Sequence, residues 1–207
     1  MERKLILIGG GSASGKTYTL NEVVKRLPEG SITRISLDDY YKDFSILPME
    51  ERVNINFDHP KAFDWPLIYK QIKALKNGEA INKPNYDFVI HGRSPKTDHV
   101  EPKQLIVVEG IMALVNKDLR SLGDLSVFIS ASRERRLVRR IERDMKERGR
   151  TFDSIVKQYF ETVQPMFEEI IGPSEYYADL IVNNEGYSTK SIDVLASVLA
   201  DMIEQDD

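Results

Sequence analysis

The stretch Gly10-Gly11-Ser12-Ala13-Ser14-Gly15-Lys16-Thr17 fits the phosphate-binding loop pattern G-x-x-x-x-G-K-[ST] at every fixed position. The apolar run 5–8 before it predicts a buried strand, and residues 19–27 predict a helix. In such a unit the glycines let backbone N–H groups turn toward a phosphate, and the helix N-terminus adds partial positive charge. Lys16 would reach the β and γ phosphates, and the Thr17 hydroxyl would bind Mg²⁺. The loop therefore predicts a nucleoside triphosphate site.

Composition limits the other classes of function. The chain has 207 residues, 41% of them hydrophobic and 30% charged, and its net charge is −4. This length suits one α/β domain, and the charge argues against a nucleic-acid-binding or membrane-surface role. The chain has no cysteine, which excludes disulfides, thiolate metal sites and cysteine nucleophiles. The apolar run near the N-terminus is too short for a signal sequence, and no stretch is long enough to span a membrane, so we expect a cytoplasmic protein.

Acidic residues follow two predicted strands. The strand predicted over 31–36 leads into Asp38 and Asp39, and the apolar run 105–108 ends at Glu109. In an open α/β sheet the ligand crevice lies at the carboxyl ends of the strands, so these acids should lie beside the phosphate loop. A solvated turn or a helix cap is the alternative for each acid. We predict a metal site formed by Thr17, Glu109 and Asp38.

The middle of the chain contains a long polar segment and a candidate flap. Residues 42–64 show little periodicity, and Asp64 should cap a helix that ends at 77–78. Residues 79–102 resemble a hairpin, with alternating Tyr86 and Phe88. These aromatic side chains could be plain packing, or together with His91 they could line a pocket for a flat, polar ring.

A basic segment follows the strand predicted at 125–129. Residues 133–150 hold nine lysines and arginines, and a helix from Ser132 to Met145 should turn an apolar face inward. The segment could be a solvated basic face or a nucleic-acid surface. We favour a lid over 133–152 that folds arginines over a phosphoryl group, with Arg148-Gly149-Arg150 as a flexible tip. The inward positions are Leu137, Val138, Ile141 and Met145.

The remaining pattern completes the fold. A helix capped at Thr151 or Asp153 should bend at Pro165, a last strand is predicted over 176–182, and an amphipathic helix closes the chain. We predict an α/β fold, a single domain over 1–207, in which a P-loop NTPase-like parallel sheet of about five strands is wrapped by helices, with a β-hairpin flap and a basic helical lid.

Two common classes of phosphate-loop protein do not fit. A GTP switch needs an N-K-x-D guanine reader, and in Asn116-Lys117-Asp118 the aspartate comes one position early. An ATP-driven motor usually carries two acids where this chain has Glu109-Gly110. A small kinase remains, with a lid and an aromatic, polar flap for the phosphoryl acceptor.

The sequence also resembles the uridine kinase (uridine–cytidine kinase) family over most of its length. The resemblance rests on these segments: Ile8-Gly9-Gly10, Leu37-Asp38-Asp39-Tyr40-Tyr41, Asn56-Phe57-Asp58-His59-Pro60, Ala62-Phe63-Asp64, Pro84-Asn85-Tyr86-Asp87-Phe88, Val108-Glu109-Gly110-Ile111, Arg143-Asp144, Glu147-Arg148-Gly149-Arg150 and Gln158-Tyr159. The Asn-Phe-Asp-His-Pro and Glu-Arg-Gly-Arg segments are more specific than the phosphate loop.

The resemblance implies ATP-dependent phosphorylation of the 5′-hydroxyl of uridine or cytidine in pyrimidine salvage. It implies that Asp38 faces that hydroxyl, that Asp58 and Arg140 hold the ribose hydroxyls, and that Tyr86 and His91 recognise the pyrimidine. The other roles it implies are pocket walls at Tyr41, Phe57 and Phe88, lid cations at Arg143, Arg148 and Arg150, and a nucleoside contact at Gln158. Lys16, Arg143 and Arg148 would act in catalysis together with Asp38, and Arg150 would contact both donor and acceptor. Family members are commonly homotetramers.

The chain departs from the family pattern near its end. Asn183-Asn184-Glu185-Gly186-Tyr187-Ser188 stands where the family usually has a proline and paired glycines, and Tyr18 stands where a small polar residue is usual. These positions border the donor base, so GTP stays open as an alternative to ATP. A kinase of the same fold that acts on phosphoribulose or pantothenate is the nearest alternative. An ATP-sensing nucleic-acid-binding module is a further one, although we expect neither a nucleic acid nor a membrane as partner.

Overall fold

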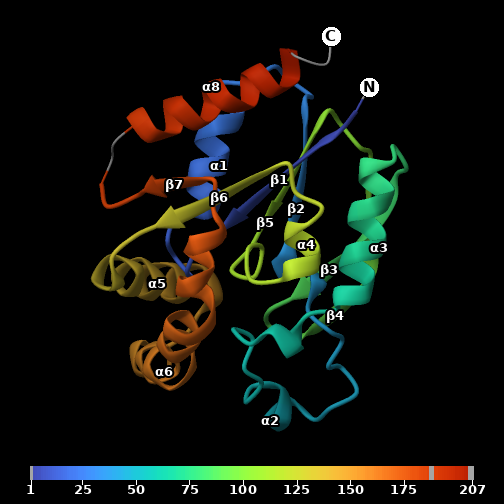
Figure 1. Cartoon of the computed structure of the whole chain (residues 1–207). Helices are drawn as coiled ribbons and strands as arrows, with labels where there is room; N and C mark the ends of the chain where they lie inside the picture. Colours follow the sequence, from blue (N-terminus) through green and yellow to red (C-terminus); the bar gives the residue numbers. More distant parts are fainter. Residues whose placement is uncertain (1, 187–188, 205–207) are drawn as a thin grey trace.

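The computed structural model describes residues 2–186 and 189–204. Within these ranges the larger sheet is parallel, with the strand order β2-β5-β1-β6-β7. Its strands are β2 (Ile32–Ser36), β5 (Leu105–Glu109), β1 (Lys4–Gly9), β6 (Leu125–Ser130) and β7 (Leu180–Asn183). Because β1 is central, the phosphate loop leaves the middle of the sheet (Figure 1). The predicted parallel sheet of about five strands is confirmed.

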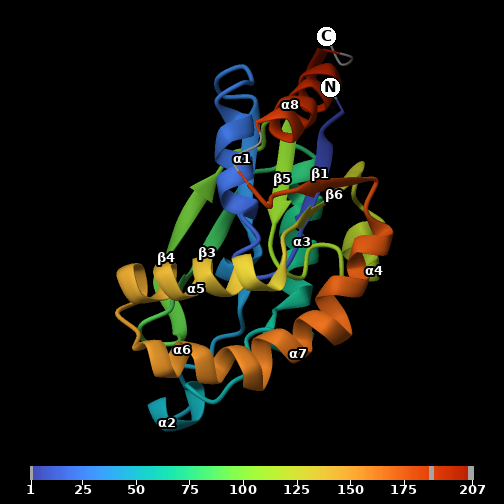
Figure 2. The ribbon, with the colours of Figure 1, turned by 90° about the vertical axis from the view of Figure 1, so that its left-hand side faces the viewer.

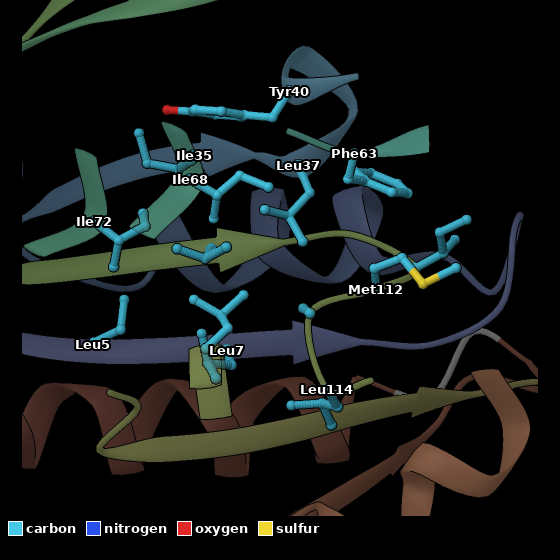
Figure 3. Packing of buried hydrophobic residues seen from close by; sticks show 14 of the residues in the cluster. Leu5, Leu7, Ile35, Leu37, Tyr40, Phe63, Ile68, Ile72, Met112 and Leu114 are labelled. Atoms are coloured by element: carbon cyan, nitrogen blue, oxygen red, sulfur yellow. The ribbon is translucent and has the colours of Figure 1, made fainter. Parts of the chain in front are cut away.

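Helices cover both faces of this sheet. On one face α1 (Lys16–Val24) and α8 (Lys190–Glu204) pack on Ile6 and Ile8 of β1. On the other, α3 (Trp65–Lys76) belongs to a second core that includes Leu5 and Leu7, and Figure 3 shows these leucines with Ile68 and Ile72 of α3 in one layer. The sheet is buried on both faces, which explains why its central strands are continuous apolar runs.

The predicted flap is an antiparallel hairpin of β3 (Ile81–Asp87) and β4 (Gly92–Val100), with a register shift between Pro84 and Tyr86. At its base Lys83 forms an ion pair with Asp39, which sits in the 3₁₀ turn Leu37–Tyr40 after β2. At its tip the Ile90 carbonyl accepts a hydrogen bond from Arg52 of α2 (Met49–Arg52). The predicted polar segment before α3 therefore supports the flap and includes a second 3₁₀ turn, Pro60–Ala62.

Helices also lie across the carboxyl end of the sheet. α5 (Arg133–Arg148) and α6 (Phe152–Gln158) pack against each other below the strands (Figure 2). The chain continues through α7 (Gln164–Met166), and π-helical turns flank it at Tyr159–Val163 and Phe167–Ile171. Pro165 has no N–H to donate, and these wider turns absorb the loss within a continuous helical path. α4 (Lys117–Arg120) is a short helix between β5 and β6, and the 3₁₀ turn Gly172–Tyr177 precedes β7.

Two sequence predictions about these segments are wrong. The buried face of α5 carries Arg136, Arg140 and Asp144, whereas Val138 and Met145 are exposed. The inward face of α5 is thus charged, because it covers the phosphate loop and a polar cavity rather than the apolar core. The last strand begins at Leu180 and not at 176, since the chain from Gly172 to Tyr177 forms the 3₁₀ turn.

No helix in the described ranges could cross a membrane.

Candidate active site

The phosphate loop has a backbone conformation that side chains at Gly10 and Gly15 would disrupt. Gly10 has φ 138° and Gly15 has φ 97°, both in the left-handed region that favours glycine. A Cβ on Gly10 would lie 2.5 Å from the Ile129 carbonyl oxygen, and one on Gly15 would overlap the Asn184 side chain. Ala13 also has a positive φ of 61°. Helix α1 begins directly after Gly15, so the loop N–H groups and the helix N-terminus share one concave surface suited to an anion.

The polar residues of the loop are positioned by backbone contacts. The Lys16 ammonium donates to the carbonyls of Gly10 and Gly11, both at 3.0 Å. The Ser14 hydroxyl is buried and has no hydrogen-bond partner among the described residues. Its carbonyl accepts a 2.7 Å hydrogen bond from the Asn184 side chain. The loop thus holds one cation and one buried hydroxyl ready for an anionic ligand.

Thr17 and Glu109 meet at the carboxyl ends of the two central strands. The Thr17 hydroxyl donates to Glu109 at 3.0 Å from Oε2. Burial raises the pKa of Glu109, and the nearby Lys16 opposes that shift. Burial in turn lowers the pKa of Lys16, which Glu109 and Asp38 oppose. The hydroxyl and the carboxylate are hard oxygen donors, and a divalent cation would favour the ionised carboxylate, so this pair fits Mg²⁺.

Asp38 is fixed by the turn that follows β2. Its backbone N–H donates to the Ser36 side chain at 3.3 Å, which starts the 3₁₀ turn. Its side chain lines the same cavity as Lys16 and Glu109, as the sequence predicted. Asp39 points away from this cavity and pairs with Lys83 at 2.5 Å. Of the two adjacent acids, only Asp38 faces the phosphate loop.

Three adjoining cavities run from the phosphate loop to the flap. The phosphate-loop cavity, of about 260 Å³, is lined by Ser12, Ala13, Gly15, Lys16, Thr17, Tyr18, Ser36, Asp38, Glu109, Gly110, Ile111, Arg139 and Arg143. The inner cavity, of about 90 Å³, is lined by Ser12, Asp38, Tyr41, Phe57, Asp58, Phe88, His91, Ile111, Arg140, Arg143, Arg148 and Gln158. Asp38 and Arg143 line both, together with Ser12 and Ile111. The two cavities therefore meet at a carboxylate and a guanidinium.

The outer cavity, of about 860 Å³, continues from the inner one under the flap. Phe57, Phe88, His91, Arg148 and Gln158 line both. Tyr86 lines only the outer cavity, together with Val53, Asn85, Asp87, Val89, Ser94, Glu147 and Arg150. Every substrate-binding residue that the resemblance implies lies on the wall of at least one of these two cavities.

Aromatic side chains shape the inner and outer cavities. The ring of Tyr41 contacts Phe57 and Tyr86 edge-on, both at 5.2 Å between centroids. His91 stacks on Phe57 at 5.3 Å with an interplanar angle of 18°. Phe88 contacts Tyr86 edge-on at 5.3 Å. The rings come from the turn after β2, the segment before α3 and the hairpin, so the tertiary fold gathers them from three segments.

Two polar atoms in this aromatic group lack a hydrogen-bond partner among the described residues. The Tyr86 hydroxyl and His91 Nδ1 are buried and make no hydrogen bond within the described residues. Burial lowers the pKa of His91, and the cations Arg150, Arg52 and Arg148 lower it further, so the imidazole is neutral near pH 7. Buried polar atoms usually have partners, and these two suit the polar edge of a flat ring.

Asp58 is buried and lines the inner cavity. Its N–H donates to the Asn56 side chain at 3.0 Å, and the His59 ring accepts from the Lys61 N–H at 3.0 Å. The polar residues on either side of Asp58 therefore shape the turn that presents it. Burial raises the pKa of Asp58, and the neighbouring Arg140 opposes the shift.

Arg140 and Arg148 of the lid contact the phosphate loop and the flap. Arg140 donates to the Ser12 hydroxyl at 2.7 Å and to Gln158 Oε1 at 2.9 Å, so it connects the phosphate loop with α6. The Arg148 guanidinium lies 4.6 Å from the centroid of the Phe88 ring. Arg150 donates to Gln158 at 2.5 Å and lines the outer cavity. The structure thus places Arg150 on the side of the acceptor cavities and away from the phosphate-loop cavity.

Sequence reasoning gave no separate role to Arg139 or to Asp144. Arg139 lines the phosphate-loop cavity and donates to the Ser14 and Asn184 carbonyls, at 3.4 and 3.0 Å. Asp144 is fully buried among arginines. Its spacing could have revealed it, because it is an acid four residues from both Arg140 and Arg148 on a strongly basic helix.

The segment 183–188, which departs from the family pattern, is described only to Gly186, and Tyr187 and Ser188 lie outside the described residues.

The fold and the site define a phosphate-loop nucleotide-binding protein of the α/β class. The solved structure of D-glycerate 3-kinase from Cryptococcus neoformans shares this fold, with a TM-score of 0.65 at 16% identity over 88% of this chain and 86% of that one. The chain belongs to the Phosphoribulokinase / Uridine kinase family, whose sequence model matches residues 5–190.

Relatives of known name cover nearly the whole chain. A uridine kinase of Lactobacillus helveticus is 44% identical, over 99% of this chain and 98% of its own length. A uridine kinase of Clostridium tetani is 41% identical over 99% of both chains. The resemblance seen in the sequence motifs is confirmed at the level of the family.

Proposed function

We propose that the chain is a uridine–cytidine kinase, a single kinase domain over 1–207 that transfers the γ-phosphoryl group of ATP to the 5′-hydroxyl of uridine or cytidine. One observation carries the proposal: Asp38 and Arg143 form a common wall of the phosphate-loop cavity and of the aromatic-lined inner cavity. A donor phosphate and an acceptor hydroxyl bound in the two cavities would meet at these side chains. The names of the nearly full-length relatives support the same reaction.

The reaction needs charge neutralisation and in-line placement more than covalent chemistry from the protein. The nucleoside O5′ forms a bond to the γ-phosphorus while the bond from that phosphorus to the β,γ-bridging oxygen breaks, and ADP leaves. Asp38 orients the 5′-hydroxyl and accepts its proton late in the transfer, since an ordinary carboxylate is too weak a base to remove it beforehand. Lys16, Arg143 and Arg148 supply positive charge around the moving phosphoryl group.

The donor occupies the phosphate loop 10–17, with Mg²⁺ held by Thr17 and Glu109 beside Asp38. Bound Mg²⁺ would neutralise phosphate charge. In the described residues no three acidic or histidine side chains gather as a metal site, and Mg²⁺ in nucleotide sites is usually held by one or two carboxylates plus the phosphates. GTP remains an alternative donor, because Tyr18 lines the phosphate-loop cavity at half exposure and the segment after Asn184 differs from the family pattern.

The roles proposed for the acceptor-binding residues follow from the cavity that each residue lines. The pyrimidine would lie against Tyr41, Phe57 and Phe88, with its polar edge facing the Tyr86 hydroxyl and His91 Nδ1. Asp58 and Arg140 would hold the ribose hydroxyls, and Arg150 of the lid and Gln158 of α6 would close the site. Phosphoribulose and pantothenate have no flat base for the aromatic wall, which disfavours the alternative acceptors. We further propose a cytoplasmic homo-oligomer, a tetramer by family resemblance, which sedimentation would test.

The test is ADP release with Mg²⁺ and ATP or GTP against uridine, cytidine, adenosine, thymidine, pantothenate and ribulose 5-phosphate. We expect turnover with uridine and cytidine alone, and with ATP as the better donor. Turnover with pantothenate or ribulose 5-phosphate in place of the pyrimidine nucleosides would reassign the acceptor cavities. If no acceptor supports turnover, nucleic-acid binding at the α5 surface is the remaining alternative, and a salt titration of binding would measure it.

A further inference from the structure

A single carboxylate lies at the centre of the arginines of the lid. Asp144 on α5 is fully buried, and its oxygens contact four guanidinium groups. The contacts are Arg143 NH2 at 2.8 Å, Arg148 NH1 at 3.5 Å, Arg140 Nε at 3.6 Å and Arg150 NH1 at 3.7 Å. Charged side chains are almost never fully buried unless they are paired. Burial of Asp144 therefore depends on these arginines.

The helix geometry explains how one residue reaches so many partners. Arg140, Asp144 and Arg148 are spaced by four positions and so share one face of α5. Gly149 follows the helix with a left-handed φ of 60°, and the chain reverses so that the Arg150 N–H donates to the Asp144 carbonyl at 3.1 Å. This turn brings Arg150 back toward the same carboxylate. The side chain and the carbonyl of Asp144 thus both fix the end of α5.

Only one of the four contacts is a close pair. Arg143 also donates through Nε to Oδ1 of Asp144 at 2.9 Å, which makes two short contacts from one guanidinium. The other oxygen, Oδ2, has no hydrogen-bond partner in the described part of the chain, and neither has the facing Arg140 Nε. Ion pairs of 3.5 to 3.7 Å are attractive but too long for good hydrogen bonds. Three of the arginines can therefore shift toward a ligand without breaking a hydrogen bond to Asp144.

Each of these arginines also contacts a wall of the proposed site. Arg140 donates to Ser12 of the phosphate loop, and Arg143 lines the boundary between the phosphate-loop and inner cavities. Arg148 lies over the Phe88 ring. Without a carboxylate among them, the four neighbouring cations would repel one another and spread apart. Asp144 would keep them together before any phosphate arrives.

We propose that Asp144 is a positioning residue, which holds Arg140, Arg143, Arg148 and Arg150 along the walls of the donor and acceptor cavities through their ion pairs. The proposal rests on the phosphoryl transfer described above for its kinetic consequences, but the arrangement of the arginines does not depend on the substrate. Asp144 touches neither cavity wall itself, so it acts only through the arginines.

The kinetic test compares Asp144→Asn with a matched control on the same helix. Glu142→Gln removes the same charge at an exposed position of α5 that lines no cavity described above. We expect D144N to lower kcat by about 30-fold or more and E142Q to leave it unchanged. If Asp144 acts through Arg143, the two substitutions are not additive. The fold-loss of kcat that D144N causes should then be at least about fivefold smaller in an Arg143→Gln background than in the wild-type background. Equal costs in the two backgrounds would contradict the proposal. Asp144→Glu keeps the charge and should lie between the wild type and D144N.

A second readout needs no substrate. Phenylglyoxal modifies accessible arginines, and mass spectrometry gives the rate at each position. We expect Arg143 and Arg148 to react several-fold faster in D144N than in wild type or E142Q, with unchanged rates at the exposed Arg34 of β2, which lines none of the three cavities. Unchanged rates at Arg143 and Arg148 in folded D144N would overturn the proposal. If D144N does not fold, D144E carries the same test: the proposal predicts faster modification and a kcat about fivefold lower, and wild-type values for both would overturn it. If the wild type phosphorylates no nucleoside, the proposed function fails while these rates still decide the role of Asp144.

Discussion

The hydroxyl of Thr17 donates a hydrogen bond to Glu109 at 3.0 Å, although 92 residues separate the two along the chain. Glu109 ends β5, and Thr17 lies in α1, which the phosphate loop joins to the neighbouring strand β1, so the parallel sheet brings the two residues together. The pair places two hard oxygen donors side by side at the phosphate loop, and it gives the first prediction.

Glu109→Gln should raise the Mg²⁺ concentration needed for half-maximal activity by about tenfold, because a neutral amide replaces the carboxylate that holds the ion or its waters. Binding of ATP in the absence of Mg²⁺ should stay close to wild type. Turnover measured over a Mg²⁺ titration checks the first point, and calorimetry with EDTA checks the second. An unchanged Mg²⁺ requirement would assign Glu109 a purely structural role.

Asp38→Asn should lower kcat for uridine by roughly 10²- to 10⁴-fold, because the amide cannot accept the proton of the 5′-hydroxyl. The binding of ATP should change little, since Lys16 and the loop N–H groups remain. Steady-state kinetics and a separate ATP titration distinguish the two effects. Asp39→Asn is the matched control for the loss of charge at the adjacent position, and its kcat should fall much less. Near-normal turnover of D38N would remove Asp38 from the mechanism.

Tyr86→Phe should weaken uridine binding without lowering the free energy of unfolding. The Tyr86 hydroxyl is buried without a partner in the described residues, so its removal should leave the free energy of unfolding unchanged within about 0.5 kcal/mol or increase it. The KM for uridine should rise by about tenfold, because the substrate loses one hydrogen bond in a desolvated pocket. Thermal unfolding and kinetics on one preparation measure both. A destabilised variant with an unchanged KM would show that Tyr86 is a core residue only.

Uridine affinity should depend on the protonation of His91. Burial and nearby arginines lower the pKa of His91 below its ordinary value of 6.5, so the folded protein favours the neutral ring. Affinity should be constant above pH 6.5 and fall as the pH drops through the lowered pKa, when the ring loses its acceptor nitrogen. Between the lowered pKa and pH 6.5 the unfolded chain binds more protons at His91 than the folded protein does. The contribution of His91 to the free energy of unfolding is therefore complete above pH 6.5 and is lost on acidification. Calorimetry of uridine binding from pH 5 to pH 8 tests this, and His91→Gln should remove most of the pH dependence in this range.

Lys83→Met should loosen the attachment of the flap. Lys83 pairs with Asp39 at 2.5 Å, and the two side chains are only 11% and 23% exposed. Loss of the lysine leaves Asp39 without this partner, which should cost about 1–3 kcal/mol of unfolding free energy. The kcat should also fall, because Asp39 adjoins Asp38. The double variant with Asp39→Asn should recover part of the stability, and a double variant less stable than K83M would contradict a role for the ion pair.

Local sequence determined much of this protein. The phosphate loop, the apolar strands, the acids after β2 and β5, and the hairpin follow from patterns a few residues long, because strand burial and loop chemistry depend on near neighbours. The same patterns misplaced the start of β7, where the tyrosines at 176–177 suit a strand but the chain forms a 3₁₀ turn.

Only the tertiary structure decided what the polar groups contact. The sequence suggested an apolar inner face for α5, whereas the helix buries Arg136, Arg140 and Asp144, because the surface beneath it is the phosphate loop and a cavity. Asp38 and Asp39 are equivalent in sequence, and the fold directs one to the donor and the other to Lys83. Burial and pairing depend on segments far apart in the chain, so the charge balance around Asp144 could be recognised only once the chain had folded.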